Sequence, residues 1–317
     1  MEAIDLFTNE RIKITNDMRL SCALGNFDGV HIGHAELLKF AAARPDGATH
    51  SAVWTFSAPP SLSFGKDARL LTTLEQKTEI FKNFGIDLVI TEEFENVADM
   101  PPEKFVSDVL VAKCRVASAI CGFNFRFGKR AAGSAEDLKE MMSSLGGTAH
   151  VLPPRKLDGT VVSSSVIRSL IESGDIELAN KMLGRPYFVR LPVVHGKRLG
   201  RSLGMPTANQ TASALSVVPR RGVYMTLCRF GGKEYPAVSN VGVRPTVDSG
   251  EKVNIETHII GFDGDVYGKT VDVDFLKFIR PEKKFSDKEE LIRQMTLDKK
   301  TAVDYFQTEA KNAYFKT

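Results

Sequence analysis

Residues 24–34 read Leu-Gly-Asn-Phe-Asp-Gly-Val-His-Ile-Gly-His, and this stretch decides the fold of the first half of the chain. Apolar residues 22–24 precede it, and apolar residues at helical spacing follow it from Leu37, as is typical of a turn between a buried strand and a helix. Glycines in such a turn let backbone N–H groups approach an anion, which the N-terminal end of the helix also favours. His31 and His34 lie one turn apart at this end. The stretch therefore predicts a phosphate-binding site.

The rest of the first half alternates strand and helix patterns. Helix starts are visible at Thr73, which can form a capping box with Gln76, and at Ser134. The expected strands are short apolar or β-branched runs at residues 21–24, 52–56, 87–91, 117–121 and 148–152. Helices between consecutive strands allow a parallel sheet, so we expect an α/β, Rossmann-like domain. The loops after its strands should converge on the ligand crevice.

The pattern changes after the helix that ends near Gly184. Short strands with tight turns follow, so we expect one domain over residues 1–184 and another over residues 185–317. The expected hairpins join 222–230 to 233–241 across Gly231-Gly232, and 254–260 to 270–279 around Asp263-Gly264.

Alternation along residues 271–275 predicts that the second domain has one solvated sheet face. Val271 and Val273 are apolar, whereas Asp272 and Asp274 are charged. This pattern is typical of an antiparallel β-barrel. A C-terminal helix is expected from about Ser286.

Composition excludes several classes of protein. Lys and Arg number 42 against 39 Asp and Glu, a net charge of +3, which is too balanced for a dedicated nucleic-acid binder. We find no run of about 18 apolar residues and no signal-peptide pattern, so we expect a cytoplasmic protein without a membrane partner. The four cysteines lack metal-ligand spacing and are expected to be reduced. Small anionic substrates fit this composition, and we expect a monomer or a weak homo-oligomer.

Three further stretches carry residues suited to anion binding, and the first two also have a purely structural interpretation. Residues 122–130 combine three aromatics with three cations, which suits a flat anionic molecule or a hydrophobic lid. The serines at 163–165 stand at the start of an expected helix, either as caps or as phosphate ligands. Arg168 follows in the next turn, from which it would reach the same anion. Residues 195–209 form a glycine-rich basic loop that lacks the P-loop pattern.

Together these motifs resemble a known family. The His-x-Gly-His pattern at 31–34 is similar to the nucleotidyltransferase signature, and the longer string resembles the prokaryotic bifunctional riboflavin kinase/FAD synthetase family. The stretches at 122–128, 162–168, 195–209 and 240–246 resemble its other motifs in the same order. The resemblance spans essentially the whole chain. It implies riboflavin, FMN and ATP as substrates and Mg²⁺ as the cofactor.

For the first domain, the resemblance implies that ATP adenylylates FMN to FAD and releases pyrophosphate. His31, His34 and Arg168 are the expected catalytic residues. Expected ATP and phosphate ligands are Gly25, Phe27, Asp28, Gly29, Ser164 and Ser165. Expected flavin contacts are Asn124, Phe125, Arg126 and Phe127.

For the second domain, the resemblance implies that ATP phosphorylates riboflavin to FMN. Glu256 would be the general base for the riboflavin 5′-hydroxyl, and Thr207 and Asn209 would hold the metal ion. Arg280 would contact the flavin. The expected ATP-covering flap contains Gly196, Lys197, Gly200 and Arg201.

One departure from the family pattern leaves a second interpretation open. Pro59 stands where the family commonly has a histidine in its Phe-x-Pro-His-Pro loop. The chain could therefore be mainly a riboflavin kinase with weakened adenylyl transfer. A non-catalytic flavin- or nucleotide-binding regulator is the third interpretation, but such a chain should lose Glu256 or Asn209, and both are present.

Overall fold

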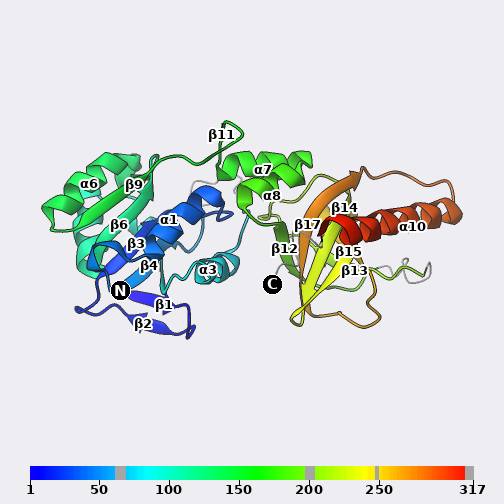
Figure 1. Cartoon of the computed structure of the whole chain (residues 1–317), viewed down its shortest axis with the longest axis horizontal. Coiled ribbons are helices and arrows are strands. Elements are labelled where there is room, and N and C mark those ends of the chain that lie inside the picture. Colours follow the sequence, from blue (N-terminus) through cyan, green and yellow to red (C-terminus); the bar gives the residue numbers. More distant parts are fainter. Residues whose placement is uncertain (61–68, 197–203, 247–249, 311–317) are drawn as a thin grey trace. The chain divides into compact units, whose positions relative to one another are not determined.

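The computed structural model describes residues 1–60, 69–196, 204–246 and 250–310 (Figure 1). By backbone contacts the chain divides into two compact units, Met1–Ser164 and Ser165–Thr317. This division differs from the boundary expected at 184/185, because helices α7 (Ser164–Ser173) and α8 (Ile176–Leu183) group with the second unit. The Asn180 amide on α8 donates to the Phe275 carbonyl at 2.8 Å, and its oxygen accepts from the Tyr187 N–H at 2.7 Å. The functional boundary at 184/185 stays a prediction.

The first unit is built on a sheet in the order β2-β1-β5-β4-β3-β6-β9. Its parallel strands confirm the five that the sequence predicts: β3 (Leu20–Leu24), β4 (His50–Phe56), β5 (Leu88–Glu92), β6 (Val116–Gly122) and β9 (Thr148–Leu152). The sequence did not predict β1 (Glu2–Asp5) and β2 (Arg11–Lys13), which add an antiparallel edge next to β5.

Helices cover both faces of this sheet, as the alternating side chains of β3 require. Ala23 packs in a cluster with residues of α1 (Ile32–Ala42) and α3 (Leu74–Asn83). Cys22 and Leu24 face the other layer, formed by the π-helical segment η2 (Phe105–Lys113) and by α6 (Ala135–Ser144). The strand order reverses at β3, which has β4 on one side and β6 on the other. Ligands of open α/β sheets bind beyond the carboxyl ends of the strands at such a switch point.

The predicted helix signals of the first unit are confirmed. Thr73 and Gln76 form both hydrogen bonds of a capping box at α3, and Ser134 caps α6. The remaining short elements of the unit are η1 (Pro45–Gly47), α4 (Phe94–Val97), α5 (Pro102–Lys104), β7 (Arg126–Phe127), η3 (Lys129–Ala131), β8 (Gly133–Ser134), β10 (Lys156–Leu157) and β11 (Thr160–Val161).

The second unit is an antiparallel sheet that closes on itself. Its strands follow the order β12 (Tyr187–Pro192), β17 (Thr270–Arg280), β14 (Gly222–Phe230), β15 (Lys233–Thr246), β16 (Gly250–Ile259) and β13 (Ala208–Thr211). The two edges meet where the Val194 N–H donates to the Asn209 carbonyl at 2.8 Å. The Gln210 amide, on β13, also donates to the carbonyls of Leu191 and Val271. The predicted barrel is therefore confirmed.

One of the two predicted hairpins is present. β14 and β15 pair across Gly231 and Gly232, which both have the positive φ that a tight hairpin turn requires. The hairpin predicted around Asp263-Gly264 is wrong, because β16 pairs with β13 and β15, whereas β17 pairs with β12 and β14.

The solvated face predicted from the alternation in β17 is also wrong. Asp272 and Asp274 are only 7% and 6% exposed. Arg190 and Arg229, from the neighbouring strands β12 and β14, each form a two-bond ion pair with one of these carboxylates. The charged side chains are therefore neutralised within the protein and shielded from water.

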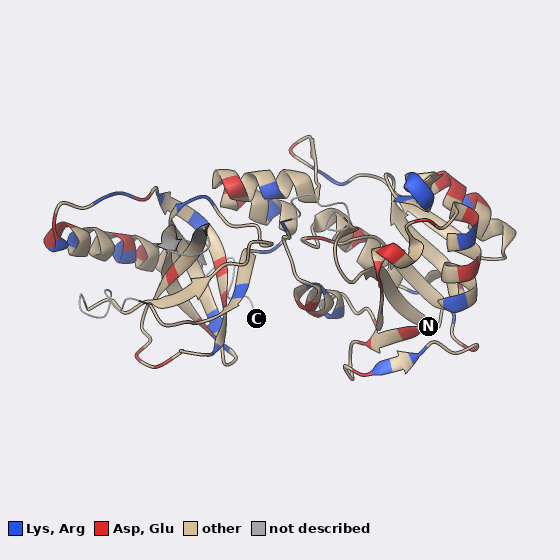
Figure 2. Cartoon of the chain, turned by 180° about the vertical axis from the view of Figure 1, so that it is seen from behind, with Lys and Arg blue, Asp and Glu red and all other residues tan. Residues whose placement is uncertain are grey.

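The C-terminal helix α10 (Lys288–Tyr305) follows Asp287, whose side chain caps it, and leads into η4 (Phe306–Ala310). α10 carries Lys and Arg as well as Asp and Glu, and α6 carries Lys139 beside three acidic residues, so charges of both signs occur on helices of both units (Figure 2). All four cysteines are buried and unbonded. None of the helices in the described ranges is both long and apolar enough to cross a membrane.

Candidate active sites

The loop after β3 has a backbone conformation that is unusual for its residues. Phe27 and Val30 have φ angles of 53° and 41°, and Gly29, between them, has 80°. Such left-handed conformations are costly for non-glycine residues and persist where surrounding contacts fix them, commonly at functional sites. Here the Phe27 ring is fully buried and contacts Phe81 and His34 edge-on. The loop is therefore held rigidly at the switch point.

Asp28 ties this loop to the segment before α3. Its buried carboxylate accepts from the backbone N–H groups of Leu71 and Thr72 at 3.0 and 3.1 Å. The Thr72 hydroxyl in turn accepts from the Gly29 N–H at 2.9 Å. These bonds give Asp28 a structural role, and its predicted phosphate contact stays a prediction.

His31 and His34 lie against each other at the start of α1. Their rings are stacked with centroids 3.6 Å apart. His31 is the N-cap, because its Nδ1 accepts from the His34 N–H at 3.2 Å. In neutral His31 the proton is therefore on Nε2, which can donate to a phosphate. The structure thus brings together the two histidines that the sequence predicts.

Ser164, the last residue of the first unit, contacts the same loop. Its hydroxyl donates to the Asp28 carbonyl at 2.8 Å. Ser165 and Arg168 follow on α7 and belong to the second unit. Their predicted roles at the phosphates of ATP stay predictions.

The aromatic loop after β6 has an exposed part and a buried part. Asn124 and Arg126 are exposed, whereas Phe127 is only 6% exposed and packs on Phe105 with centroids 5.6 Å apart. Phe125 is partly buried and stacks on Phe127. The Phe127 ring is a core residue in this structure. Phe123, which was not among the predicted contacts, is 49% exposed in the same loop.

A second group of polar side chains lies on one face of the barrel sheet. Asn209 on β13 and Asn240 on β15 are the cross-strand partners of Glu256 on β16. The Asn254 amide donates to Glu256 Oε1 at 3.0 Å and reaches Asn209 Oδ1 at 3.4 Å. Asn254 Oδ1 is buried and accepts no hydrogen bond from the described residues. The side chains of Asn209, Asn254 and Glu256 therefore form one network.

Gly196 is placed where only glycine fits. A Cβ at this position would come within 2.6 Å of the Asn209 side chain, whose Nδ2 donates to the Thr207 carbonyl at 3.2 Å. Lys197, Gly200 and Arg201, the other expected flap residues, lie outside the described residues. Within the described ranges, no three His, Cys, Asp or Glu side chains are grouped to hold a metal ion.

Comparison with known proteins assigns each half of the chain. A family model for FAD synthetase matches residues 13–166, and one for riboflavin kinase matches residues 183–306. A bifunctional riboflavin kinase/FMN adenylyltransferase of Bacillus subtilis is 36% identical over 294 residues, which cover 90% of this chain and 92% of the relative. That of Escherichia coli (strain K12) is 34% identical, with coverage of 89% and 91%. The chain belongs to this family.

A solved structure gives the same fold. It is described as a macrolide-efflux protein from Streptococcus pneumoniae, and it is 30% identical to this chain. The match has a TM-score of 0.82 and covers 92% of this chain and 98% of the other.

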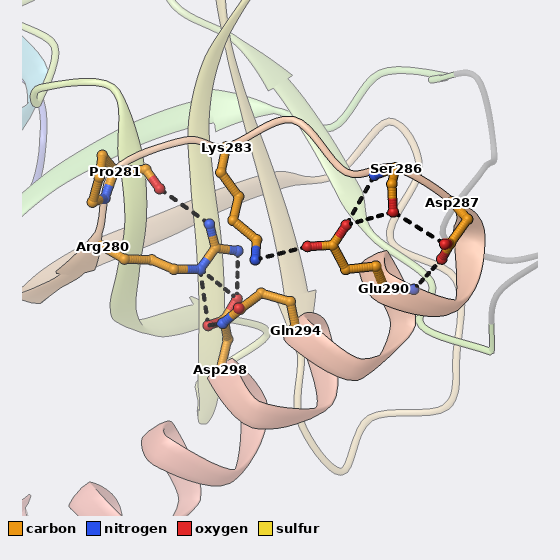
Figure 3. Close-up of polar contacts among 8 residues, drawn as sticks. All are labelled: Arg280, Pro281, Lys283, Ser286, Asp287, Glu290, Gln294 and Asp298. Carbon is orange, nitrogen blue, oxygen red and sulfur yellow. Dashed lines mark hydrogen bonds and ion pairs between the residues drawn. The ribbon is translucent and has the colours of Figure 1, made fainter.

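Within this riboflavin kinase/FMN adenylyltransferase chain, Arg280 is engaged by the C-terminal helix (Figure 3). Its guanidinium donates to Asp298 through Nε at 3.1 Å and Nη2 at 2.7 Å. Gln294 donates to the same carboxylate at 2.9 Å, and Lys283 pairs with Glu290 nearby. Arg280 thus fastens α10 to the end of β17, and its flavin contact stays a prediction.

Lys77, which lies behind the loop after β3, was not predicted from the sequence. Lys77 is only 6% exposed and donates to the Asn26 carbonyl at 3.0 Å. The sequence does contain a signal that Lys77 is buried. Lys77 stands three and four residues before Ile80 and Phe81, which places it on the apolar stripe of α3. A charged residue on such a stripe has to be paired inside the protein.

Proposed function

We propose that the chain makes FAD in two ATP-dependent steps, one in each half. Riboflavin is phosphorylated to FMN in the barrel, and FMN is adenylylated to FAD in the α/β unit with release of pyrophosphate. The observation that carries the proposal is that each family model matches one half, and each half has its own group of polar side chains. These are the stacked His31 and His34 in one half and the network around Glu256 in the other.

For the kinase step, Glu256 acts as the general base. Its carboxylate takes the proton of the riboflavin 5′-hydroxyl, the oxygen attacks the γ-phosphorus of ATP, and ADP leaves. Asn254 orients the carboxylate through the bond to Oε1. A positioned general base typically contributes a factor of about 10²–10⁴ to the rate.

The residues beside Glu256 fit a magnesium ion. Mg²⁺ prefers oxygen ligands, and Thr207 and Asn209 provide hydroxyl and amide oxygens. The buried Asn254 Oδ1, which accepts no hydrogen bond from the described residues, supplies a further oxygen acceptor nearby. We assign Thr207 and Asn209 to the ion, which when bound would neutralise charge on the phosphates of ATP.

For the adenylyl step, the protein aligns two phosphates and neutralises their charge. An FMN phosphate oxygen attacks the α-phosphorus of ATP in line, and the bond to pyrophosphate breaks. His31 Nε2 can donate to a phosphate oxygen, because Nδ1 is already an acceptor at the N-cap of α1. The motif around Ser164, Ser165 and Arg168 supports further phosphate contacts, and that around Asn124, Phe125 and Arg126 supports the flavin contacts.

The test is a time course with purified chain, riboflavin, ATP and Mg²⁺, in which riboflavin, FMN and FAD are separated by chromatography. We expect FMN to appear first and FAD to follow. If FMN accumulates without FAD, the chain is chiefly a kinase, as Pro59 in the place of the usual loop histidine would suggest. If neither product forms, both assigned activities are wrong.

A further inference from the structure

Lys77 contacts the loop after β3 through its ammonium group. Its Nζ donates to the Asn26 carbonyl at 3.0 Å and lies 3.5 Å from Thr55 Oγ1. The Thr55 hydroxyl donates to the same carbonyl at 3.2 Å. Thr55 is fully buried on β4, and Lys77 is almost fully buried on α3. Side chains from β4 and α3 therefore donate hydrogen bonds to the same backbone carbonyl oxygen.

Burial of the Lys77 ammonium costs free energy, and an apolar side chain that only filled the space would avoid this cost. Burial lowers the pKa of Lys77 to about 8, an effect that the nearby Asp28 carboxylate opposes. A buried ammonium requires hydrogen-bond partners, whereas a leucine at the same position would pack without that cost. The Lys77 charge therefore lies where α3 contacts the backbone of the loop at Asn26.

These hydrogen bonds to the Asn26 carbonyl also fix the direction of the Phe27 N–H group. In a planar trans peptide the C=O and the following N–H point in opposite directions, so the Phe27 N–H points away from Lys77. No group of the described residues accepts a hydrogen bond from this N–H. Phe27 has the left-handed φ of 53°, which needs outside contacts to persist.

We propose that Lys77, together with Thr55, is a positioning residue for FMN adenylylation, because their hydrogen bonds to the Asn26 carbonyl hold the loop that ends at His31 in the conformation that binds ATP. This inference rests on the proposed function of the first unit. Lys77 itself does not contact the substrate. Its ammonium acts through the loop.

The main test is Lys77→Met, which keeps most of the side-chain length and removes the charge and the donor. We expect KM for ATP in FAD formation from FMN to rise roughly tenfold or more, because the loop would lose its fixed conformation. Riboflavin phosphorylation, in the other half, should be unchanged. Lys82→Met is the matched control, because Lys82 is exposed on the same helix, and it should behave as wild type.

Trp54 shows whether the variant is folded. It is the only tryptophan of the chain, it is 2% exposed, and it precedes Thr55 on β4. If Lys77→Met loses the native Trp54 emission, Thr55→Val decides the question. This variant removes the second donor to Asn26 and should raise KM for ATP about threefold or more.

Three outcomes overturn the inference. The first is a folded Lys77→Met chain whose KM for ATP and kcat are unchanged. The second, in case that chain does not fold, is a Thr55→Val chain with unchanged KM. A wild-type chain that makes no FAD from FMN would overturn the proposed function as well, so the two failures are distinguishable.

Discussion

Asn254 and Glu256 stand two residues apart on β16, and the Asn254 amide donates to Glu256 Oε1 at 3.0 Å. Residues i and i+2 of a strand share a face, so this bond forms without distortion of the sheet. Asn209, on the neighbouring strand, joins the same network at 3.4 Å. The carboxylate is thus oriented by the fold itself before any substrate binds, which is the arrangement that a general base requires.

Replacement of this carboxylate should separate the two activities. We expect Glu256→Gln to lower the rate of FMN formation by a factor of about 10²–10⁴, because the amide cannot accept the hydroxyl proton. FAD formation from added FMN should stay near the wild-type rate. Chromatography of the flavins with each starting substrate measures both. A Glu256→Gln chain that phosphorylates riboflavin normally would contradict the assignment.

The complementary change is His31→Asn, which tests the imidazole while it preserves the cap of α1. Asparagine is a good N-cap residue and can still accept from the His34 N–H. We expect FAD formation to fall by a factor of roughly 10–100 and FMN to accumulate from riboflavin, because one phosphate donor is lost. His31→Ala should add a loss of stability of about 1 kcal/mol. Normal FAD formation by the asparagine variant would exclude a role for the His31 ring.

The sequence predicts those parts of the fold that depend on local signals. The turn from β3 into α1 is predictable, because its glycines and the apolar spacing of Leu37 and Leu38 are neighbours in the chain. The turn at Gly231 and Gly232 is also local, and its hairpin is present. The segment with His31 was found in this way, whereas Glu256 was assigned from the resemblance to the family.

Long-range partners are what the sequence pattern could not supply. Asp263-Gly264 has the composition of a hairpin turn, yet the strands on either side of it pair elsewhere. The alternation along β17 predicted a solvent-exposed face, because nothing near Asp272 in the sequence indicates that Arg190 will form an ion pair with it. The apolar stripe of α3 indicates that Lys77 is buried, but it does not reveal the partner, since Asn26 lies in the loop after β3.

Loss of the Arg280 ion pair should weaken the second unit specifically. Asp298 is 4% exposed and the Arg280 side chain is 19% exposed, so Asp298→Asn removes the counter-charge of a partly buried guanidinium. We expect a loss of about 2 kcal/mol of stability, the usual range for hydrogen bonds to charged groups. Riboflavin phosphorylation should then disappear at a lower urea concentration, while the Trp54 transition stays in place. Lys283→Met, which removes the exposed partner of Glu290, is the control and should change the transition little.

Acid stability of the first unit should depend on Asp46. This carboxylate accepts from Ser118 and Thr148 and lies 2.8 Å from His150 Nε2. The hydrogen bond with His150 and those from Thr148 and Ser118 lower the pKa of Asp46 to about 2. A carboxyl pKa that is lower in the folded state than in the unfolded state stabilises the protein above the unfolded value, near pH 4. That stabilisation is lost as the pH falls toward 2.

We therefore expect Asp46→Asn to lower the urea midpoint followed by Trp54 at pH 7. The cost should be on the order of 1 kcal/mol, since the carboxylate is partly exposed and screened by water. Asn accepts the left-handed φ of 58° at this position, so the backbone is not strained by the change. The difference between variant and wild type should narrow as the pH is lowered from 4, because wild-type Asp46 then becomes protonated. Asp99→Asn, which replaces an exposed carboxylate, should shift the midpoint little at any pH. A constant difference between the Asp46 variant and wild type down to the lowest pH at which both fold would show that charge is not the source of the stabilisation.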